Sequence, residues 1–296
     1  MWYIWSDPDF LEANAENTPA LDHNRAFAYG DGVFERISVG AGRPLWVERH
    51  LMRLYQGADR IGLEMPVGAD GLLLGLNNLA TSTVGSPAGG ATWRLFAFRV
   101  SGGRYLPHDD RGCLMLQTAP APLPYPAWSP DRLHIGVAQQ PKVAVTLPEI
   151  KRSSALDYVL AAREARRMGW HDALMLNPAG MVAECSSSNV FVVAQRQLLT
   201  PPLADGCLPG VMRGLLLESL AGEVGLNAGE RSLTLADCLG ADAVLLTNAS
   251  SGIRDVGTIG STSIAHSDWA RHLQRVLQHA AHQAMGIQPF NHPPPA

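Results

Sequence analysis

The chain has 296 residues, of which 46% are apolar and 17% charged, and its formal net charge is −4. This composition supports a substantial core in one large domain or two ordinary ones, and it excludes a disordered chain. Because no long basic run is present, neither nucleic acid nor an anionic membrane is favoured, and we expect a small-molecule substrate.

The sequence also carries no signal for export or for a metal. Its opening, MWYIWSDPDF, lacks a basic segment followed by a long apolar core, and no apolar run is long enough to span a bilayer. The ten histidines show no metal-ligand spacing. The cysteines form no CxxC pair; they are Cys113, Cys185, Cys207 and Cys238. We therefore expect a cytoplasmic protein without a structural disulfide or a metal site.

The first 118 residues mix helix and strand signals in an order that is typical of an α+β domain. A possible first strand opens the chain, and a glycine turn in AFAYGDGVFERISV leads into another strand. A helix is predicted over LWVERHLMRLYQGADRIG, where Leu51, Leu54, Ala58 and Ile61 share one face. Two strands, near TWRLFAFRV and GCLMLQTA, complete a small N-terminal domain over residues 1–118.

A proline-rich run over residues 119–130, APAPLPYPAWSP, is the clearest boundary in the sequence. It cannot continue a helix or a central strand, so it predicts a semi-extended linker. The remaining residues, 131–296, are expected to form a larger C-terminal domain. A proline-rich segment, NHPPPA, ends the chain.

The larger domain is predicted to contain many short strands with interspersed helices. A strand at LHIGVA precedes a helix over about residues 155–168, for which Gly169 is a plausible C-cap. The segment DALMLNPAGMVAE predicts a hairpin with its turn at residues 177–180. A strand over 190–194, a glycine-rich loop opening a helix at GCLPGVMRG, a strand at DAVLLTN and a last helix over 267–285 follow. This pattern suggests a barrel-like domain.

Three features of the larger domain could act together chemically. Lys151, one of only two lysines, lies just ahead of a predicted amphipathic helix; it is either a solvated lysine or a Schiff-base lysine with a lowered pKa. The segment DGCLPGVMR is either an ordinary loop or a phosphate cup at a helix N-terminus. Glu184, at the start of a buried strand, is either a structural acid or the partner of a buried cation.

An amine, a phosphate cup and a buried acid are the three parts that a pyridoxal phosphate site requires. The amine bonds to the cofactor aldehyde, the cup holds the phosphate, and the acid keeps the pyridine nitrogen protonated so that the ring can accept electrons. On this interpretation Glu184 faces a pyridinium ion, and the opposite charge explains how a buried carboxylate is tolerated.

Five motifs in one order strengthen this interpretation. They are YGDGVFE (29–35), HLMRL around Arg53, IK with the helix after it, AECSSSNVF, and LPGVMR with its companion TNASSGI. On these motifs, nearly the whole chain resembles the class IV, or fold-type IV, pyridoxal phosphate enzymes. That family includes branched-chain aminotransferases, D-amino acid aminotransferases and 4-amino-4-deoxychorismate lyases. The resemblance implies a two-domain fold, with a small α/β sandwich domain and a larger barrel-like α/β domain, and a homodimer.

The resemblance also implies roles for individual residues. Lys151 would be the catalytic lysine, Glu184 the partner of the ring nitrogen and Arg53 a phosphate ligand. Cofactor contacts are expected from Lys151, Glu184, Arg53, Ser188, Asn189, Leu208, Gly210, Val211, Met212, Asn248, Ala249 and Ser250. Substrate contacts are expected from Tyr29, Phe34, Arg99 and Arg104.

The subfamily is indicated by smaller differences. Branched-chain aminotransferases usually have a tyrosine five residues after the lysine, where this chain has Leu156. RVSGGRY, over residues 99–105, resembles an arginine- and glycine-rich segment of the lyases, and TNAS has the asparagine common in lyases. Val100, Ser154 and Met212 depart from the family patterns. Arg104 is either a solvated loop residue or a ligand of a substrate carboxylate in the active site of its own or of a partner subunit, and Arg94 and Arg99 compete for that role.

The sequence therefore predicts a lyase that makes p-aminobenzoate and pyruvate from 4-amino-4-deoxychorismate for folate synthesis. The first alternative is an aminotransferase that moves an amino group from a D-amino acid, a branched-chain amino acid or an (R)-amine to a 2-oxo acid. An alternative of another class is a non-catalytic relative that binds a phosphate-bearing ligand.

Overall fold

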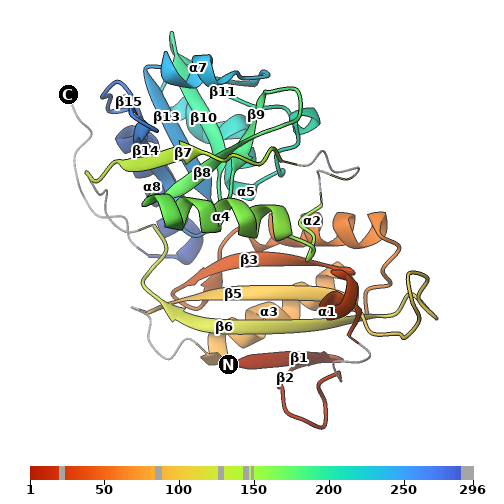
Figure 1. Cartoon of the computed structure of the whole chain (residues 1–296). Helices are drawn as coiled ribbons and strands as arrows, with labels where there is room; N and C mark the ends of the chain where they lie inside the picture. The colour runs from red at the N-terminus through yellow and green to blue at the C-terminus, as the bar shows by residue number, and fades with distance from the viewer. Residues whose placement is uncertain (20–23, 84–88, 126–129, 143–146, 148–149, 288–296) are drawn as a thin grey trace.

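Two sheets organise the chain (Figure 1). The computed structural model describes residues 1–19, 24–83, 89–125, 130–142, 147 and 150–287. Part of the predicted linker, residues 126–129, and the proline-rich tail lie outside these residues. Within the described ranges, no helix combines the length and the apolarity needed to cross a bilayer.

The first sheet has six strands, all antiparallel, in the order β2-β1-β6-β5-β3-β4. The strands are β1 (Trp2–Ser6), β2 (Asp9–Glu12), β3 (Gly32–Gly40), β4 (Arg43–Pro44), β5 (Gly90–Arg99) and β6 (Gly112–Ala121). The helices of this half are α1 (Arg25–Tyr29), α2 (Val47–Arg60) and α3 (Ala69–Thr83). Together they form the α+β unit that the sequence predicts.

Helices α2 and α3 cover one face of this sheet, and the core of the first half lies between them and the strands. The predicted apolar face of α2 is confirmed: Leu51, Leu54 and Ala58 are buried in this core, and Ile61 packs against it. Side chains alternate along β3. Val33 and Ile37 therefore point toward the helices with Glu35, whereas Phe34 points to the opposite face.

Strand β6 runs three residues into the predicted linker, because Gly90 of β5 is still paired with Ala121. Pro120 is tolerated in this strand since β1, the neighbour on the other side, pairs with β6 only as far as Gln117. A proline at the edge of a sheet loses no ladder hydrogen bond on its free side. The exact domain limits stay a prediction.

The second sheet has nine strands, and eight of them follow the order β12-β11-β10-β13-β14-β7-β8-β9, with β15 paired to β14. The strands are β7 (Leu133–Val137), β8 (Asp172–Leu176), β9 (Val182–Cys185), β10 (Asn189–Ala194), β11 (Gln197–Thr200), β12 (Asn227–Glu230), β13 (Ala243–Asn248), β14 (Gly252–Ile259) and β15 (Thr262–Ser263). The end strand β9 continues into β10 through three serines, and the Cys185 N–H donates to the Ser188 carbonyl at 2.8 Å. The path from β10 to β9 thus curls back on itself, as expected for a barrel-like domain.

The helical segments of this half are α4 (Leu156–Met168), η2 (Leu203–Asp205), α5 (Val211–Leu215), η3 (Leu216–Leu220), α6 (Ala221–Glu223), α7 (Leu235–Leu239) and α8 (Trp269–Met285). The predicted C-cap of α4 is confirmed, because Gly169 has a left-handed backbone. Segments α5, η3 and α6 form one continuous helical run, in which η3 is a π-turn. Helices α5 and α8 pack on the outside of the sheet, and a separate apolar core lies between β7, β9, β10 and β14.

Candidate active site

Lys151 lies in the connection between β7 and α4, where the backbone of β3 holds it. The Phe34 N–H donates to the Lys151 carbonyl at 2.9 Å, and the Lys151 amine lies 4.6 Å from the centroid of the Phe34 ring. Burial, followed by the positive charge of Arg53, lowers the pKa of Lys151 to about 8. A buried amine that is partly neutral near physiological pH is suited to act as a nucleophile or a base.

Glu184 is fixed by the hairpin that the sequence predicts. In the β8–β9 hairpin Met175 pairs with Glu184, whose side chain points inward and is 3% exposed. Its Oε2 accepts from the Leu208 N–H at 3.1 Å and from Asn189 Nδ2 at 3.3 Å. Its Oε1 accepts from the Tyr158 hydroxyl at 2.7 Å and forms an ion pair with Lys142.

The predicted phosphate cup lies at the start of the helical run after Gly210. No side chain caps this end among the described residues, so the N–H groups of Val211 and Met212 in the first turn are available to an anion. A Cβ on Gly210 would lie 2.0 Å from Asn189 Oδ1, so glycine is required here by close packing. Asn189 Nδ2 also donates to the Leu208 carbonyl at 2.8 Å, and thereby connects the cup to Glu184.

Arg53 reaches the same loop from α2. One guanidinium nitrogen donates to the Pro209 carbonyl at 2.7 Å, and the other two donate to Glu35 at 2.7 and 2.6 Å. Burial opposes ionisation of Glu35, but Arg53 and His50 together hold its pKa at about 2. The guanidinium is therefore anchored by a buried carboxylate beside the phosphate cup.

The companion loop after β13 is shaped by Asn248. The side-chain oxygen of Asn248, Oδ1, accepts from the N–H groups of Ser250 and Ser251 at 3.0 and 2.7 Å, and its Nδ2 donates to Ser188 Oγ at 3.2 Å. The Ala249 carbonyl accepts from two hydroxyl groups at 2.7 Å, those of Ser38 and Tyr125. The loop is thus tied both to the serines after β9 and to the first sheet.

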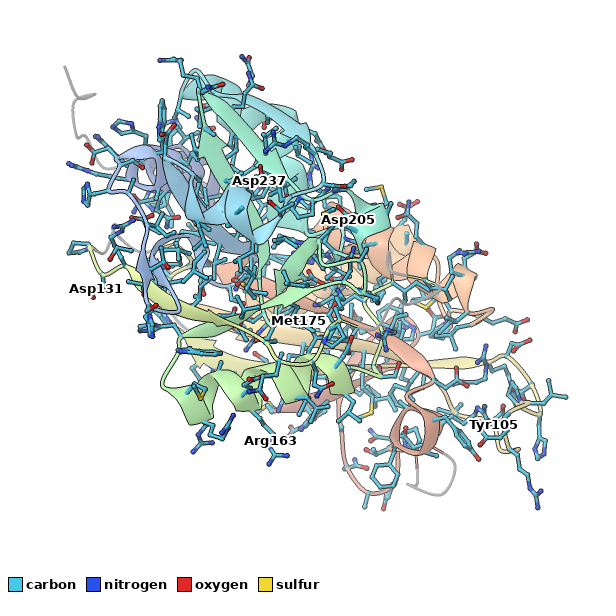
Figure 2. All side chains as sticks on the ribbon, turned by 45° about the horizontal axis from the view of Figure 1, so that its top comes forward. Tyr105, Asp131, Arg163, Met175, Asp205 and Asp237 are labelled. Carbon is cyan, nitrogen blue, oxygen red and sulfur yellow. The ribbon has the colours of Figure 1, made fainter. Side chains whose placement is uncertain are left out.

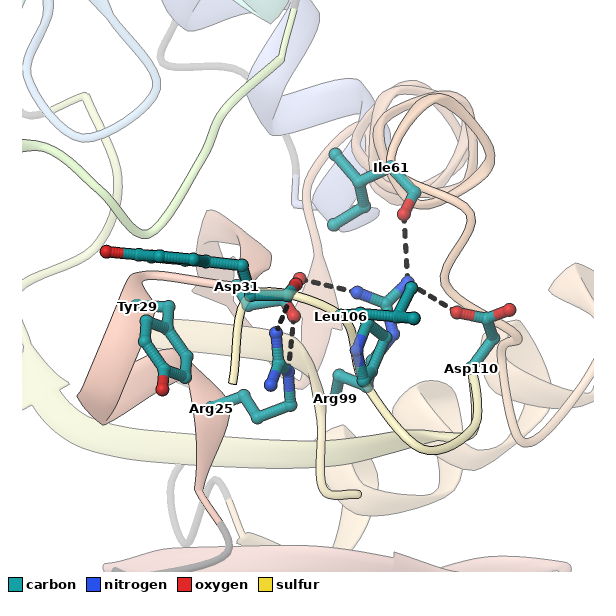
Figure 3. Close-up of a pocket in the computed structure, with 9 residues that line it drawn as sticks. Arg25, Tyr29, Asp31, Ile61, Arg99, Leu106 and Asp110 are labelled. Carbon is teal, nitrogen blue, oxygen red and sulfur yellow. Dashed lines mark hydrogen bonds and ion pairs between the residues drawn. The ribbon is translucent and has the colours of Figure 1, made fainter. Parts of the chain in front are cut away.

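The four predicted substrate residues do not gather at one place. Phe34 lies beside Lys151, whereas Tyr29 and Arg99 line a pocket of about 420 Å³ whose lining includes neither Lys151 nor Glu184. Arg99 is buried in this pocket and paired with Asp31 at 2.6 Å (Figure 3). Arg104 is exposed on the loop between β5 and β6, next to Tyr105, which projects from the molecule (Figure 2).

The backbone of this loop is held by Arg25. Its guanidinium donates to the carbonyls of Gly103, Arg104 and Tyr105 at 3.2, 2.5 and 3.2 Å. Asp31 accepts from Arg25 at 2.7 Å and keeps the guanidinium in place (Figure 3). Arg104 is therefore an exposed side chain on a firmly anchored backbone.

Sequence reasoning missed Lys142, Tyr158, Glu35 and His50 as neighbours of the site. The signal for Lys142 was its rarity, since a lysine among apolar residues in PKVAV is unusual in a chain with two lysines. For Glu35 the signal was an acid within a β-branched strand. No group of three or more metal-ligating side chains occurs among the residues that the structure describes.

The assembled residues fit pyridoxal 5′-phosphate. The buried amine would bond to its aldehyde, the uncapped first turn and Arg53 would hold its phosphate, and the buried acid would face its ring nitrogen. The packing of Gly210 against Asn189 supports this fit, because the cup and the acid are joined by one side chain.

Comparison with known proteins gives the same class. The profile of the family described as amino-transferase class IV matches residues 32–259. A putative branched-chain-amino-acid aminotransferase of Methanocaldococcus jannaschii is 28% identical over 84% of this chain and 85% of its own. The aminodeoxychorismate lyase of Vibrio harveyi is 28% identical over 80% of this chain and 86% of its own. The crystal structure of 4-amino-4-deoxychorismate lyase from Pseudomonas aeruginosa has a TM-score of 0.78 and 28% identity, and the match covers 94% and 98% of the two chains.

The chain therefore belongs to the class IV aminotransferase family. It is an enzyme with pyridoxal 5′-phosphate as its cofactor, and it is either an aminotransferase or an aminodeoxychorismate lyase of that family. The predicted family, cofactor and two-domain α+β fold are confirmed. The roles of the individual site residues stay predictions.

Proposed function

We propose that the protein is a lyase that converts 4-amino-4-deoxychorismate to p-aminobenzoate and pyruvate, and so serves folate biosynthesis. The observation that carries this proposal is the position of the tyrosine that follows Lys151 in the sequence. The position where branched-chain aminotransferases usually have a tyrosine holds Leu156, which is 68% exposed. The nearby Tyr158 donates its hydroxyl to Glu184 instead.

Lys151 has the properties that this reaction needs. With a pKa of about 8, roughly a tenth of the amine is neutral at pH 7 and can accept a proton. It would remove the proton from the substrate carbon that bears the amino group, while the bound cofactor supplies the electron sink. Loss of the enolpyruvyl group then makes the ring aromatic, and Lys151 would return its proton to the departing fragment, which leaves as pyruvate.

Arg104 is the residue we propose for the substrate carboxylate. The substrate carries carboxylates, which a planar guanidinium binds with two parallel hydrogen bonds. Arg104 is exposed and its backbone is anchored by Arg25, whereas Arg99 already donates to Asp31, Ile61 and Gly62. Arg99, which competes for this role, is therefore less suitable.

The alternative is transfer of the amino group to a 2-oxo acid, which the relative from M. jannaschii favours. Both activities use the same lysine and acid, so only the products distinguish them. Purified enzyme is mixed with pyridoxal phosphate and aminodeoxychorismate without any oxo acid. We expect p-aminobenzoate and pyruvate in equal amounts. Turnover that requires an added 2-oxo acid would overturn the lyase proposal in favour of the aminotransferase.

The attachment point of the cofactor is tested separately. Borohydride reduction followed by peptide mass spectrometry locates the adduct, and the presence of only two lysines makes the result unambiguous. We expect the adduct on Lys151. A non-catalytic relative that binds a phosphate-bearing ligand would give no adduct at either lysine.

We also propose that two copies of the chain associate. Leu156, Val159 and Leu160 are exposed at helical spacing on α4, and such an apolar stripe is typical of an interface. The same face carries Arg163, which points away from Met175 and the strands (Figure 2). Sedimentation is expected to give a dimer for the native chain and a monomer for Leu160→Glu. A native monomer would contradict this proposal.

A cytoplasmic location is inferred from the cysteines. All four are free, as expected in a reducing compartment. Fractionation of the source cells is expected to recover the protein with cytoplasmic markers, and recovery with exported proteins would contradict the inference.

A further inference from the structure

The ammonium group of Lys142 is a buried charge to which the proposed reaction assigns no task. Lys142 follows the end of β7, where its N–H donates to the Leu176 carbonyl at 2.7 Å, and it is 2% exposed. Its amine forms an ion pair with Glu184 Oε1 and donates to the Tyr158 hydroxyl at 2.8 Å. The same amine lies 4.7 Å from the centroid of the Tyr158 ring.

The hydrogen-bonding capacity of Glu184 is already filled by this arrangement. A carboxylate offers about four acceptor sites, two on each oxygen. Oε2 is occupied by the Leu208 N–H and by Asn189, and Oε1 by Tyr158 and Lys142. A protonated ring nitrogen that binds Glu184 must therefore replace one of these four donors.

Lys142 is the donor that can leave at the lowest cost. The Leu208 N–H belongs to the backbone, and Asn189 is held by a second bond to the Leu208 carbonyl. Tyr158 has a stiff aromatic side chain on α4. Lysine is long and flexible, and its head group is readily hydrated once it reaches water.

Charge leads to the same conclusion. Within the site, the ammonium and the carboxylate compensate one another, which makes their burial tolerable. A ring nitrogen carrying a proton would place two positive charges against the single carboxylate. Because the ring is delivered together with a phosphate that Arg53 and the helix N-terminus attract, the amine is the cation that must move.

We propose that Lys142 is a stand-in cation, which compensates Glu184 in the cofactor-free protein and gives up Oε1 to the ring nitrogen when the cofactor binds. This inference rests on the proposed role of Glu184. Lys142 is then a positioning residue that sets the affinity for the cofactor, and it takes no part in the reaction.

The first test measures cofactor binding by variants without the charge. Lys142→Met and Lys142→Gln are prepared free of cofactor, and pyridoxal phosphate is titrated by absorbance. Because the carboxylate loses its stand-in, we expect binding about tenfold tighter than in the native chain, with a lower unfolding temperature for the cofactor-free form and a larger rise on binding. Lys142→Arg keeps the charge and is expected to bind like the native chain.

Arg132→Met is the matched control. Arg132 forms a partly buried ion pair in the same half of the chain, with Asp255 at 2.5 Å, and shares no partner with Glu184. Its loss is expected to lower the unfolding temperature of both forms equally and to leave the affinity unchanged. Native-like or weaker binding by both neutral Lys142 variants would overturn the proposal.

The second test uses the native chain and therefore does not depend on the folding of a variant. Acetylation with acetic anhydride is followed by peptide mass spectrometry, with and without cofactor fixed by borohydride. Lys142 is expected to be protected in the cofactor-free protein and at least about fivefold more reactive in the loaded one. Equal protection in both forms would overturn this inference alone, whereas absence of an adduct on Lys151 would refute the proposed function itself.

Discussion

Replacing Lys151 by methionine is expected to stabilise the cofactor-free protein at neutral pH. Burial, and then Arg53, lowers the pKa of Lys151 from its ordinary value of 10.5 to about 8. A difference of about 2.5 units, at about 1.4 kcal/mol each, corresponds to about 3 kcal/mol that the folded protein loses by burying the ammonium. Lys151→Met removes this cost and is therefore about 3 kcal/mol more stable near pH 7.

The sign of the pH dependence follows from the same shift. Between about pH 8 and 10.5 the unfolded chain binds more protons at this position than the folded chain does, so the native protein gains stability as the pH rises. The advantage of Lys151→Met is thus complete below pH 8 and disappears by about pH 10.5. If the native protein instead lost stability relative to Lys151→Met between about pH 8 and 10.5, the sign of the expected pH dependence would be wrong.

Thermal unfolding of the cofactor-free proteins at about pH 7, 8.5 and 10 measures the effect. At roughly 2 °C per kcal/mol for a chain of this size, the variant is expected to unfold about 6 °C higher at pH 7. Arg167→Met, which removes an exposed charge on α4, is the control for removing a cation. A pH-independent difference between Lys151→Met and the native protein would refute the reasoning.

Three further predictions concern the rest of the site. Gly210→Ala brings a methyl group 2.0 Å from Asn189 Oδ1, and a clash of this kind costs about 1–3 kcal/mol, so calorimetry should show lower stability and titration weaker cofactor binding. Arg104→Gln is expected to raise KM at least about tenfold with unchanged cofactor affinity. Arg99→Gln removes a buried guanidinium that pairs with Asp31 and should lower the unfolding temperature; the reverse pattern would reassign the carboxylate ligand. Arg53→Met leaves a buried carboxylate without its main partner and is expected to cost about 3–5 kcal/mol in denaturant unfolding; a loss below about 1 kcal/mol would contradict the buried pair.

Local signals in the sequence predicted much of the fold. The spacing of leucines in α2, the left-handed Gly169 after α4 and the turn at Asn177–Gly180 each depend on neighbouring residues, and all three are present. Helix α3 was missed although it spans Ala69–Thr83. Its three successive leucines are flanked by Gly71 and Gly75, which obscures a period of 3.6 residues and lowers helix propensity.

The site was less predictable, because its contacts join distant segments. The order of the motifs identified Lys151 and Glu184 as candidate active-site residues. The pairing of Glu184 with Lys142, 42 residues earlier, depends on where β7 and β9 lie in the barrel. The anchoring of Arg53 by Glu35 likewise depends on α2 packing against β3. No periodicity within one segment carries that information.

The clamp formed by Arg25 has an evolutionary consequence. The Arg25 guanidinium holds residues 103–105 only through hydrogen bonds to their backbone carbonyl oxygens, which are present whatever the side chain is. Mutations that exchange the side chains of Arg104 and Tyr105 would therefore leave the path of the backbone intact, whereas Gly103 must stay glycine because its φ is +101° and a Cβ would lie 2.4 Å from the Leu106 carbonyl oxygen. Related chains could therefore differ in the side chains that this loop presents to a ligand and still keep the same loop backbone.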